Sequence, residues 1–341
     1  MPTSHPSTLV PPEGSVSPRA HDAVKSSGTG VSSKDRIIIP CNHDRAEVRI
    51  GAKALTLTHC DKVFWSKRKI TKGQLLQYYA DIAPVLLPHI ANRAMVMKRY
   101  PNGADGEFFF QKRAPQPHPG WLAICEILHP SMNRVGFPVI NDVADLLWVV
   151  NLGCIDLNPW YARCDDVDRP DYMHFDLDPT PGADFDLVRQ AALLVHQALD
   201  GLKMRNYAKT TGSRGIHIYV PIVRGPDQKT VWTIAKALAK DLATREPGML
   251  TAEYKVARRP KARVLVDYNQ NAWGRTLASV YSVRPLPLAT VSAPVTWEEV
   301  ADGITIEDFR LENMRERLRA VGDLFQPILS PRGRFHLESL V

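Results

Sequence analysis

Two aspartates in the segment Met173-His-Phe-Asp-Leu-Asp-Pro179 carry the clearest chemical signal in the chain. Apolar and polar residues alternate in this segment, which predicts a β-strand whose side chains two positions apart share one face. Asp176 and Asp178 would then lie side by side, and each would raise the pKa of the other unless a cation lies between them. Mg²⁺ and Mn²⁺ prefer such oxygen ligands. Acids that cap the turn of the following Pro-Thr-Pro-Gly give the same pattern, so the pair alone leaves both interpretations open.

A third acid, Asp267, ends another apolar strand, which the alternation predicts from Arg263 to Asn269. An aspartate that starts a turn before Asn-Gln-Asn would have the same local sequence. If sheet pairing brings Asp267 beside the first two acids, three carboxylates can hold two divalent ions. A two-metal site of this kind binds both the attacking and the leaving oxygen in phosphoryl transfer.

The segment Lys209-Thr-Thr-Gly-Ser-Arg-Gly-Ile-His217 combines two glycines, hydroxyl groups and a guanidinium at the entry to a third predicted strand. Glycines let backbone N–H groups approach a ligand, and Arg214 adds a fork of donors, so the segment predicts a phosphate-binding loop. A tight hairpin is the commoner origin of such a turn. The segment lacks the aspartate of the Lys-x-Asp-Gly ligase nucleophile, and we exclude that activity.

Aromatic and basic residues are interleaved between positions 98 and 113. Tyr100 follows Lys98 and Arg99, and Phe108-Phe-Phe110 precedes Lys112-Arg113. Rings beside cations suit the bases and backbone of an exposed nucleic-acid strand. A run of three phenylalanines is also common in a hydrophobic core, and the sequence does not decide between the two.

Composition narrows the class of protein. The 341 residues contain 43 Lys+Arg and 36 Asp+Glu, a formal charge of 43 − 36 = +7, which permits a polyanionic partner. Neither a membrane span nor a signal peptide is apparent. The five cysteines are scattered and form no C-x-x-C pair, which argues against a disulfide framework or a zinc knuckle. We therefore expect an intracellular protein without membrane association.

Regular elements are predicted around these motifs. Residues 1–45 form a Ser/Pro-rich tail, predicted to be disordered, and the globular composition begins at Ala46. Hydrophobic periodicity predicts helices over residues 72–88, 186–202, 229–242 and 311–324, a further helix opened by Thr296, and a hairpin near residues 49–57. The strands are predicted at 173–179, 215–221 and 263–269. This order indicates an α+β fold. Residues from Ser330 onward are expected to fray.

The motifs occur together in an order that resembles the polymerase domain of bacterial ligase D, a member of the archaeo-eukaryotic primase superfamily. The resemblance spans residues 55–325 and implies one catalytic domain with two lobes over residues 46–325, mixed and antiparallel sheets flanked by helices, and a C-terminal extension over residues 326–341. The matching segments are His59-Cys-Asp-Lys62, Lys98-Arg-Tyr-Pro-Asn-Gly103, Phe109-Phe-Gln-Lys112, Phe175-Asp-Leu-Asp-Pro179, Thr211-Gly-Ser-Arg-Gly-Ile-His217, Val266-Asp-Tyr-Asn-Gln-Asn271 and Ser279-Val-Tyr-Ser-Val-Arg284.

The resemblance also implies roles for single residues. The catalytic acids that hold two Mn²⁺ or Mg²⁺ ions would be Asp176, Asp178 and Asp267. The incoming NTP or dNTP would be bound by Ser213, Arg214, His217 and Arg284, with Lys209 nearby. The DNA would be bound by Lys62 and Lys72 at a 5′-phosphate, by Lys98 and Arg99 along the strand, and by Phe109 and Phe110 against template bases.

Two positions depart from the family pattern. Asn158, in Leu157-Asn-Pro-Trp160, replaces a histidine found near the sugar of the incoming nucleotide, and His59 stands where relatives often have asparagine. Asparagine can still bond a 2′-hydroxyl, but the family's preference for ribonucleotides does not carry over securely. The choices between NTP and dNTP, and between Mn²⁺ and Mg²⁺, stay open.

The resulting prediction is a cytoplasmic, nucleoid-associated polymerase that fills gaps and extends 3′-ends at DNA breaks in non-homologous end joining. Its partners would be DNA with a 3′-overhang, gap or 5′-phosphate, and possible cooperating proteins are Ku and a DNA ligase. The main alternative is a non-catalytic module that bridges DNA ends through a 5′-phosphate. A primase that starts chains ranks third, because the cysteines provide no zinc or iron–sulfur element for initiation.

Overall fold

The computed structural model describes residues 36–40, 43–129 and 132–340. The disorder predicted for the tail therefore lies mainly outside the described residues. The described end of the tail belongs to the folded region: Arg36 forms an ion pair with Asp81 at 2.7 Å, and Ile39 is buried. Ordered packing thus begins before the predicted boundary at residue 46, because an arginine and an isoleucine near the end of the tail find partners on the first helix.

Six α-helices lie in the described part of the chain. They are α1 (Lys72–Ile90), α2 (Val143–Asn151), α3 (Phe185–Gly201), α4 (Gln228–Arg245), α5 (Trp297–Asp302) and α6 (Met314–Val321).

The strands of the described residues form small hairpins and two larger sheets. They are β1 (Arg45–Ile50), β2 (Lys53–Thr58), β3 (Val63–Trp65), β4 (Ile70–Thr71), β5 (Met95–Arg99), β6 (Phe109–Gln111), β7 (Ile124–Leu128), β8 (Arg134–Pro138), β9 (Cys154–Pro159), β10 (Ala162–Arg163), β11 (Asp166–Pro170), β12 (Tyr172–Pro179), β13 (Tyr207–Thr210), β14 (Ile216–Pro221), β15 (Leu250–Thr251), β16 (Val264–Asp267) and β17 (Pro294–Val295).

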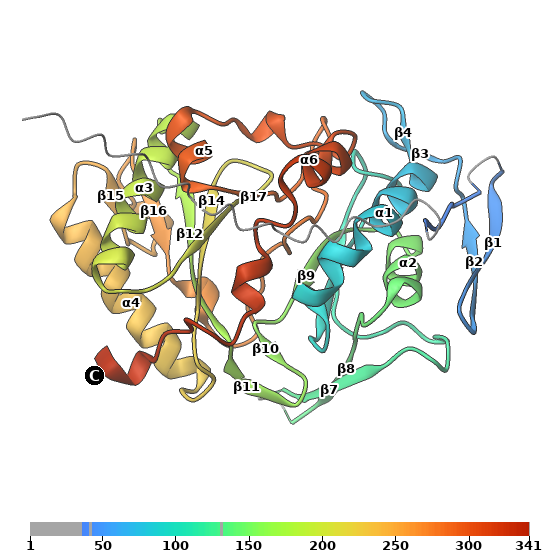
Figure 1. Cartoon of the computed structure of the whole chain (residues 1–341), viewed down its shortest axis with the longest axis horizontal. Coiled ribbons are helices and arrows are strands. Elements are labelled where there is room, and N and C mark those ends of the chain that lie inside the picture. Colours follow the sequence, from blue (N-terminus) through green and yellow to red (C-terminus); the bar gives the residue numbers. More distant parts are fainter. Residues whose placement is uncertain (1–35, 41–42, 130–131, 341) are drawn as a thin grey trace, which may run out of the picture. The chain divides into compact units, whose positions relative to one another are not determined.

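The larger sheet has six strands in the order β15-β16-β12-β14-β13-β17. All its neighbours are antiparallel except β15 and β16. Helices α3 and α4 pack on this sheet (Figure 1). The predicted α+β class with mixed and antiparallel sheets is confirmed. Residues Phe175 and Leu177 are fully buried, and they alternate with the aspartates of β12, which therefore project from the opposite face.

A second, three-stranded sheet has the order β6-β5-β9, and helices α1 and α2 pack together beside it (Figure 1). The buried Tyr79 joins these parts: its hydroxyl donates to Ile155 O in β9 at 2.7 Å and accepts from Val283 N at 3.1 Å. Since Val283 precedes Arg284, this contact fixes the chain that leads Arg284 toward the larger sheet.

Most predicted elements are confirmed near their expected bounds. Thr71 caps α1 in a capping box with Gln74, and Thr296 caps α5 in a capping box with Glu299. The strand predicted from residue 263 to 269 ends at Asp267, because a 3₁₀ turn over Asn269–Asn271 follows. The helix predicted over residues 311–324 is shorter, at Met314–Val321.

The prediction that the chain frays from Ser330 onward is wrong. Phe335 exchanges backbone hydrogen bonds with Pro221 and Val223 at the end of β14, and Leu337 is fully buried. Both apolar residues offset the ordering entropy of this segment by leaving water. In the described part of the chain, no helix is both long and apolar enough to cross a lipid bilayer.

Candidate active site

A row of directly opposed residues crosses four strands of the larger sheet. Asp267 of β16 pairs with Asp176 of β12, Asp176 pairs with His217 of β14, and His217 pairs with Lys209 of β13. Directly opposed residues of antiparallel strands project from the same face. Asp178, two positions beyond Asp176, projects from that face too. We call these five residues the acid row, after its three aspartates: Asp267, Asp176, Asp178, His217 and Lys209.

The carboxylates of the acid row are close enough to affect one another. Burial raises the pKa of Asp176 to about 6. Burial, followed by the charge of Asp176, raises the pKa of Asp178 to about 6 and also raises the pKa of Asp267. A cation would reverse these shifts, because it favours the ionised form of each acid. The sequence left open whether Asp267 lies beside Asp176 and Asp178, and the structure places it there.

The oxygens of the three aspartates differ in how they are occupied. Asp176 Oδ1 is buried and lies 3.2 Å from His217 Nε2, yet no described residue completes a hydrogen bond to it. Asp178 Oδ1 lies 3.4 Å from Arg214 Nε. Asp267 accepts hydrogen bonds from Asn269 N at 2.8 Å and Gln270 Nε2 at 3.1 Å. Buried polar atoms normally have partners, so the orphaned oxygen of Asp176 indicates a missing one.

The donor set fits Mg²⁺ or Mn²⁺, which take carboxylate oxygens, better than a softer metal, which would need sulfur or imidazole ligands. Within residues 36–40, 43–129 and 132–340, no three or more His, Cys, Asp or Glu side chains are already arranged to hold a metal ion. Metal binding by the acid row stays a prediction.

Lys209 lies behind His217 and away from solvent. Its side chain is fully buried, and its Nζ lies 2.6 Å from His217 Nδ1, 2.9 Å from Ala278 O and 2.6 Å from Ser292 Oγ. Burial moves the pKa of both Lys209 and His217 well below their usual values. Lys209 Nζ contacts Nδ1 of the ring, and Nε2 is the ring nitrogen that faces Asp176. Lys209 can thus affect a ligand only through His217, which refines its expected place near the triphosphate.

Hydrogen bonds inside the predicted phosphate-binding loop fix its conformation. Thr211 Oγ1 accepts hydrogen bonds from the backbone N–H groups of Ser213, Arg214 and Gly215, at 3.0–3.1 Å. Gly215 is required because a Cβ there would collide with the carbonyl of Leu177. The N–H groups expected to bind phosphate are therefore already engaged. The side chains of Ser213 and Arg214 are the groups that this loop presents.

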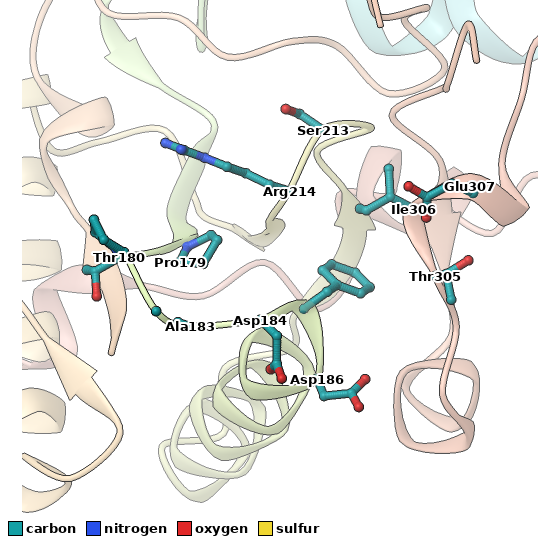
Figure 2. Close-up of a pocket in the computed structure, with 13 residues that line it drawn as sticks. Pro179, Thr180, Ala183, Asp184, Asp186, Ser213, Arg214, Thr305, Ile306 and Glu307 are labelled. Atoms are coloured by element: carbon teal, nitrogen blue, oxygen red, sulfur yellow. The ribbon is translucent and has the colours of Figure 1, made fainter. Parts of the chain in front are cut away.

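A cavity of about 590 Å³ adjoins this loop. Figure 2 shows Ser213 and Arg214 on one side of it, the start of α3 with Asp184 and Asp186 below, and residues 305–307 opposite. The cavity lies next to the acid row, because Arg214 in its wall approaches Asp178 to 3.4 Å.

Arg284 reaches the same loop from a distant part of the chain. Its Nη1 donates to Thr211 O at 2.7 Å, and its Nε lies 3.3 Å from Asp156 Oδ2. Asn158, on the same strand as Asp156, is buried and donates to Asp156 O at 3.0 Å. The sequence analysis selected Asn158 and missed Asp156. The signal was available, since Asp156 and Asn158 are two residues apart on a strand, as are Asp176 and Asp178.

The three phenylalanines are surface residues and not core. Phe109 and Phe110 are 45% and 58% exposed. Strand β5 carries cations over them: Lys98 Nζ lies 4.1 Å from the ring centre of Phe108, and the Arg99 guanidinium lies 5.2 Å from that of Phe109. We call strands β5 and β6 with these side chains the aromatic–basic ribbon. Lys98 is directly opposite Asp156 on β9, so the ribbon adjoins the strand that contacts Arg284.

The two lysines expected at a 5′-phosphate differ. Lys62 is only partly buried, and its Nζ donates to Pro101 O and Asn102 Oδ1. Lys72 is buried at the first turn of α1, where its Nζ donates to Thr58 O at 2.6 Å and Asn151 Oδ1 at 2.9 Å. Burial lowers the pKa of Lys72 to about 8. The structure therefore brings Lys62, but not Lys72, to a position open to a ligand.

Comparison with known proteins shows which family the chain belongs to. The family model described as LigD, primase-polymerase domain, matches residues 71–325. The multifunctional non-homologous end joining protein LigD of Mycolicibacterium smegmatis is 33% identical over 274 residues, which cover 80% of this chain and 36% of that protein. The bifunctional LigD of Bacillus subtilis is 30% identical over 271 residues, covering 79% and 43%. The chain thus spans well under half of the length of these relatives.

A solved structure, the polymerase domain from Mycobacterium tuberculosis ligase D in complex with DNA, is also similar. The match has a TM-score of 0.76 at 28% identity and covers 81% of this chain and 98% of the other. The family model covers most of the described residues, including the acid row, the loop around Arg214 and Arg284. The chain belongs to the LigD primase-polymerase domain family.

Proposed function

We propose that the chain is a DNA-directed nucleotidyltransferase that adds nucleotides to a 3′-end at a DNA break, filling gaps under the direction of a template. The observation that carries the proposal is the acid row, in which Asp176 and Asp267 are directly opposed across two strands and share raised pKa values. A loop with an exposed arginine lies beside it. Acids, arginine and an aromatic surface are the three parts that phosphoryl transfer on a nucleic acid requires.

Divalent ions bound to Asp176, Asp178 and Asp267 would supply the activation of the 3′-hydroxyl and neutralise charge on the leaving pyrophosphate. The protein groups do the rest. Arg214 leaves its long contact with Asp178 to bind the triphosphate, and Ser213 at the tip of the loop donates its hydroxyl. Arg284 contributes a second guanidinium. These fixed cations stabilise the charge that develops as the phosphoryl group moves.

The DNA would lie along the aromatic–basic ribbon. Phe109 and Phe110 offer exposed faces for template bases, while Lys98 and Arg99 supply positive charge for the backbone. Lys62 is the cation available for a 5′-phosphate, and Lys72 supports the backbone beneath it from a buried position. A Ku-type protein and a DNA ligase are the partners that the relatives' role in end joining suggests.

The test is extension of a gapped duplex with a recessed 5′-phosphate, with NTP or dNTP and with Mn²⁺ or Mg²⁺. We expect incorporation by the wild-type chain and by Asp302→Asn, which changes an exposed acid at the end of α5. Asp176→Asn and Asp178→Asn should abolish incorporation while DNA binding survives. Binding without incorporation under every condition would favour the end-bridging module instead, and wild-type extension by either site variant would remove the acid row from the mechanism.

A further inference from the structure

We propose that Asp156 is a positioning residue that holds Arg284 against the phosphate-binding loop and so sets the affinity for the incoming nucleoside triphosphate. This inference rests on the proposed function and adds to it a residue outside the acid row. Asp156 belongs to the three-stranded sheet and Arg284 to the segment that connects β16 and β17 of the larger sheet, so their contact joins separate parts of the site.

The guanidinium of Arg284 contacts two groups, one by an ion pair and one by a hydrogen bond, and its Nε completes no hydrogen bond to a described residue. Nε lies 3.3 Å from Asp156 Oδ2, and Nη1 donates to Thr211 O at 2.7 Å. Among the described residues, none accepts a hydrogen bond from Nη2. With Nη1 hydrogen-bonded and Nε beside a carboxylate, Nη2 is the nitrogen left for a ligand oxygen.

Close packing makes Arg284 and the loop one unit. Gly212 has φ +65°, and a Cβ at that position would lie 2.7 Å from Arg284 Cγ. The backbone of Arg284 donates to Thr290 O at 2.7 Å, and the Thr290 hydroxyl in turn donates to Gly212 O. Arg284 therefore cannot shift without the loop that carries Ser213 and Arg214, and whatever aligns Arg284 aligns the loop as well.

Asp156 is an unusual ion-pair partner. Its side chain is only 2% exposed, and Oδ1 has no hydrogen-bond partner anywhere in the described residues. A carboxylate buried with one oxygen unpaired costs stability, and such groups are retained mainly where function needs them. Asp171, which is 1% exposed, also has an Oδ1 without a hydrogen-bond partner, but Arg93 Nη2 donates to its Oδ2 at 2.8 Å, whereas Arg284 approaches Asp156 only to 3.3 Å. The long contact and the unpaired oxygen of Asp156 therefore indicate that it positions Arg284 for a ligand and does not mainly stabilise the fold.

Asp156 also connects Arg284 to the DNA-binding surface. It is directly opposite Lys98 of the aromatic–basic ribbon, and its charge raises the pKa of Lys98 against the larger, opposing effect of burial. One carboxylate thus lies between a lysine expected on the DNA path and an arginine expected on the triphosphate. Through these contacts, Asp156 can place the two substrates relative to each other.

A double-mutant cycle with Asp156→Asn and Arg284→Gln tests the proposal. Two quantities are measured: the Kd of a fluorescent nucleoside triphosphate in the absence of DNA, and KM and kcat for that nucleotide on the gapped duplex. Asp156→Asn should raise Kd and KM about tenfold with kcat changed by less than about threefold. In the Arg284→Gln background the same change should have no further effect on Kd, because Asp156 affects binding of the free nucleotide only through Arg284. Additive effects of the two substitutions, or an unchanged Kd in Asp156→Asn, would overturn the inference.

Asp165→Asn is the matched control: it breaks a bidentate pair with Arg224, whose side-chain hydrogen bonds go to Asp165, Asp166 and Arg169 and not to the loop, and it should leave Kd and KM unchanged. If Asp156→Asn does not fold, as judged by circular dichroism, the cycle is run with Asp156→Glu. This variant keeps the charge but displaces it, and its expected threefold rise in Kd should again vanish with Arg284→Gln. A wild-type chain that neither binds nucleotide nor extends DNA would contradict the proposed function itself. If the wild type is active and Asp156→Asn leaves Kd and KM unchanged, only this inference is contradicted.

Discussion

The acid row and the aromatic–basic ribbon differ in almost every physical property. Asp176, His217 and Lys209 of the row are buried and Asp178 and Asp267 partly buried; the side chains come from four strands, and burial shifts the pKa of every member away from the usual value. In the ribbon the phenylalanine rings are exposed and the two cations partly buried, and all of them come from two short strands adjacent in sequence and the residue before the second. A catalytic site needs charges at fixed positions that water does not screen. A surface that binds a long polyanion needs accessible cations and rings that can contact many different sequences.

This comparison predicts that single changes in the row are far more damaging than single changes in the ribbon. Asp267→Asn should lower the rate of extension by about a thousandfold, because it removes one acid of a set that acts as a unit. DNA affinity, measured by fluorescence anisotropy, should be unchanged. Asp302→Asn is the matched acid-to-amide control. A loss of less than about tenfold would mean that Asp267 is a neighbour of the site and not part of it.

Single substitutions in the ribbon should weaken nucleic-acid binding without abolishing it. Phe109→Ala should weaken the affinity for single-stranded template by roughly 10- to 100-fold, since stacking on an aromatic ring contributes about 1–3 kcal/mol per base. The rate at saturating DNA should stay within about threefold of wild type. Leu202→Ala, at an exposed apolar residue after α3, serves as the control. An equal loss in both variants would show that the ribbon is an ordinary surface.

The smallest expected effect is on the free energy of unfolding. It tests the difference between the acid row and the ribbon, because it depends on the burial of Asp176. Burial raises the pKa of Asp176 from 3.8 to about 6 in the folded chain. The folded state therefore binds more protons, so this contribution to stability is present below pH 3.8 and is lost as pH rises through about 6. Asp176→Asn should stabilise the metal-free chain at pH 7.5 by on the order of 2 kcal/mol, with little difference at pH 4.

Urea unfolding in a chelator at both pH values measures this effect. Added Mn²⁺ should stabilise the wild type and have less effect on Asp176→Asn, because metal binding requires the ionised carboxylates. A variant less stable than the wild type at pH 7.5 would show that Asp176 is satisfied in the folded chain by its own neighbours, with no strain for a cation to relieve.

Local elements of the fold were predictable because their signals are short-range. The capping boxes at Thr71 and Thr296 and the alternation around Asp176 need only a few neighbouring residues to form. The C-terminal segment was misjudged because its partners, Pro221 and Val223, lie more than a hundred residues away. Lys72 was expected on a surface for a similar reason: its burial depends on Thr58 and Asn151, which no local pattern connects to it.

By itself, the sequence determined the chemical inventory: which segments alternate, where acids stand two apart, where glycines and arginine form a turn, and which family the motifs resemble. Only the tertiary structure decided that Asp267 is directly opposite Asp176, that Lys209 is buried against His217, and that Asp156 forms an ion pair with Arg284. Strand register and desolvation are set by the summed contacts of segments distant in sequence, so neither can be obtained from any one segment alone.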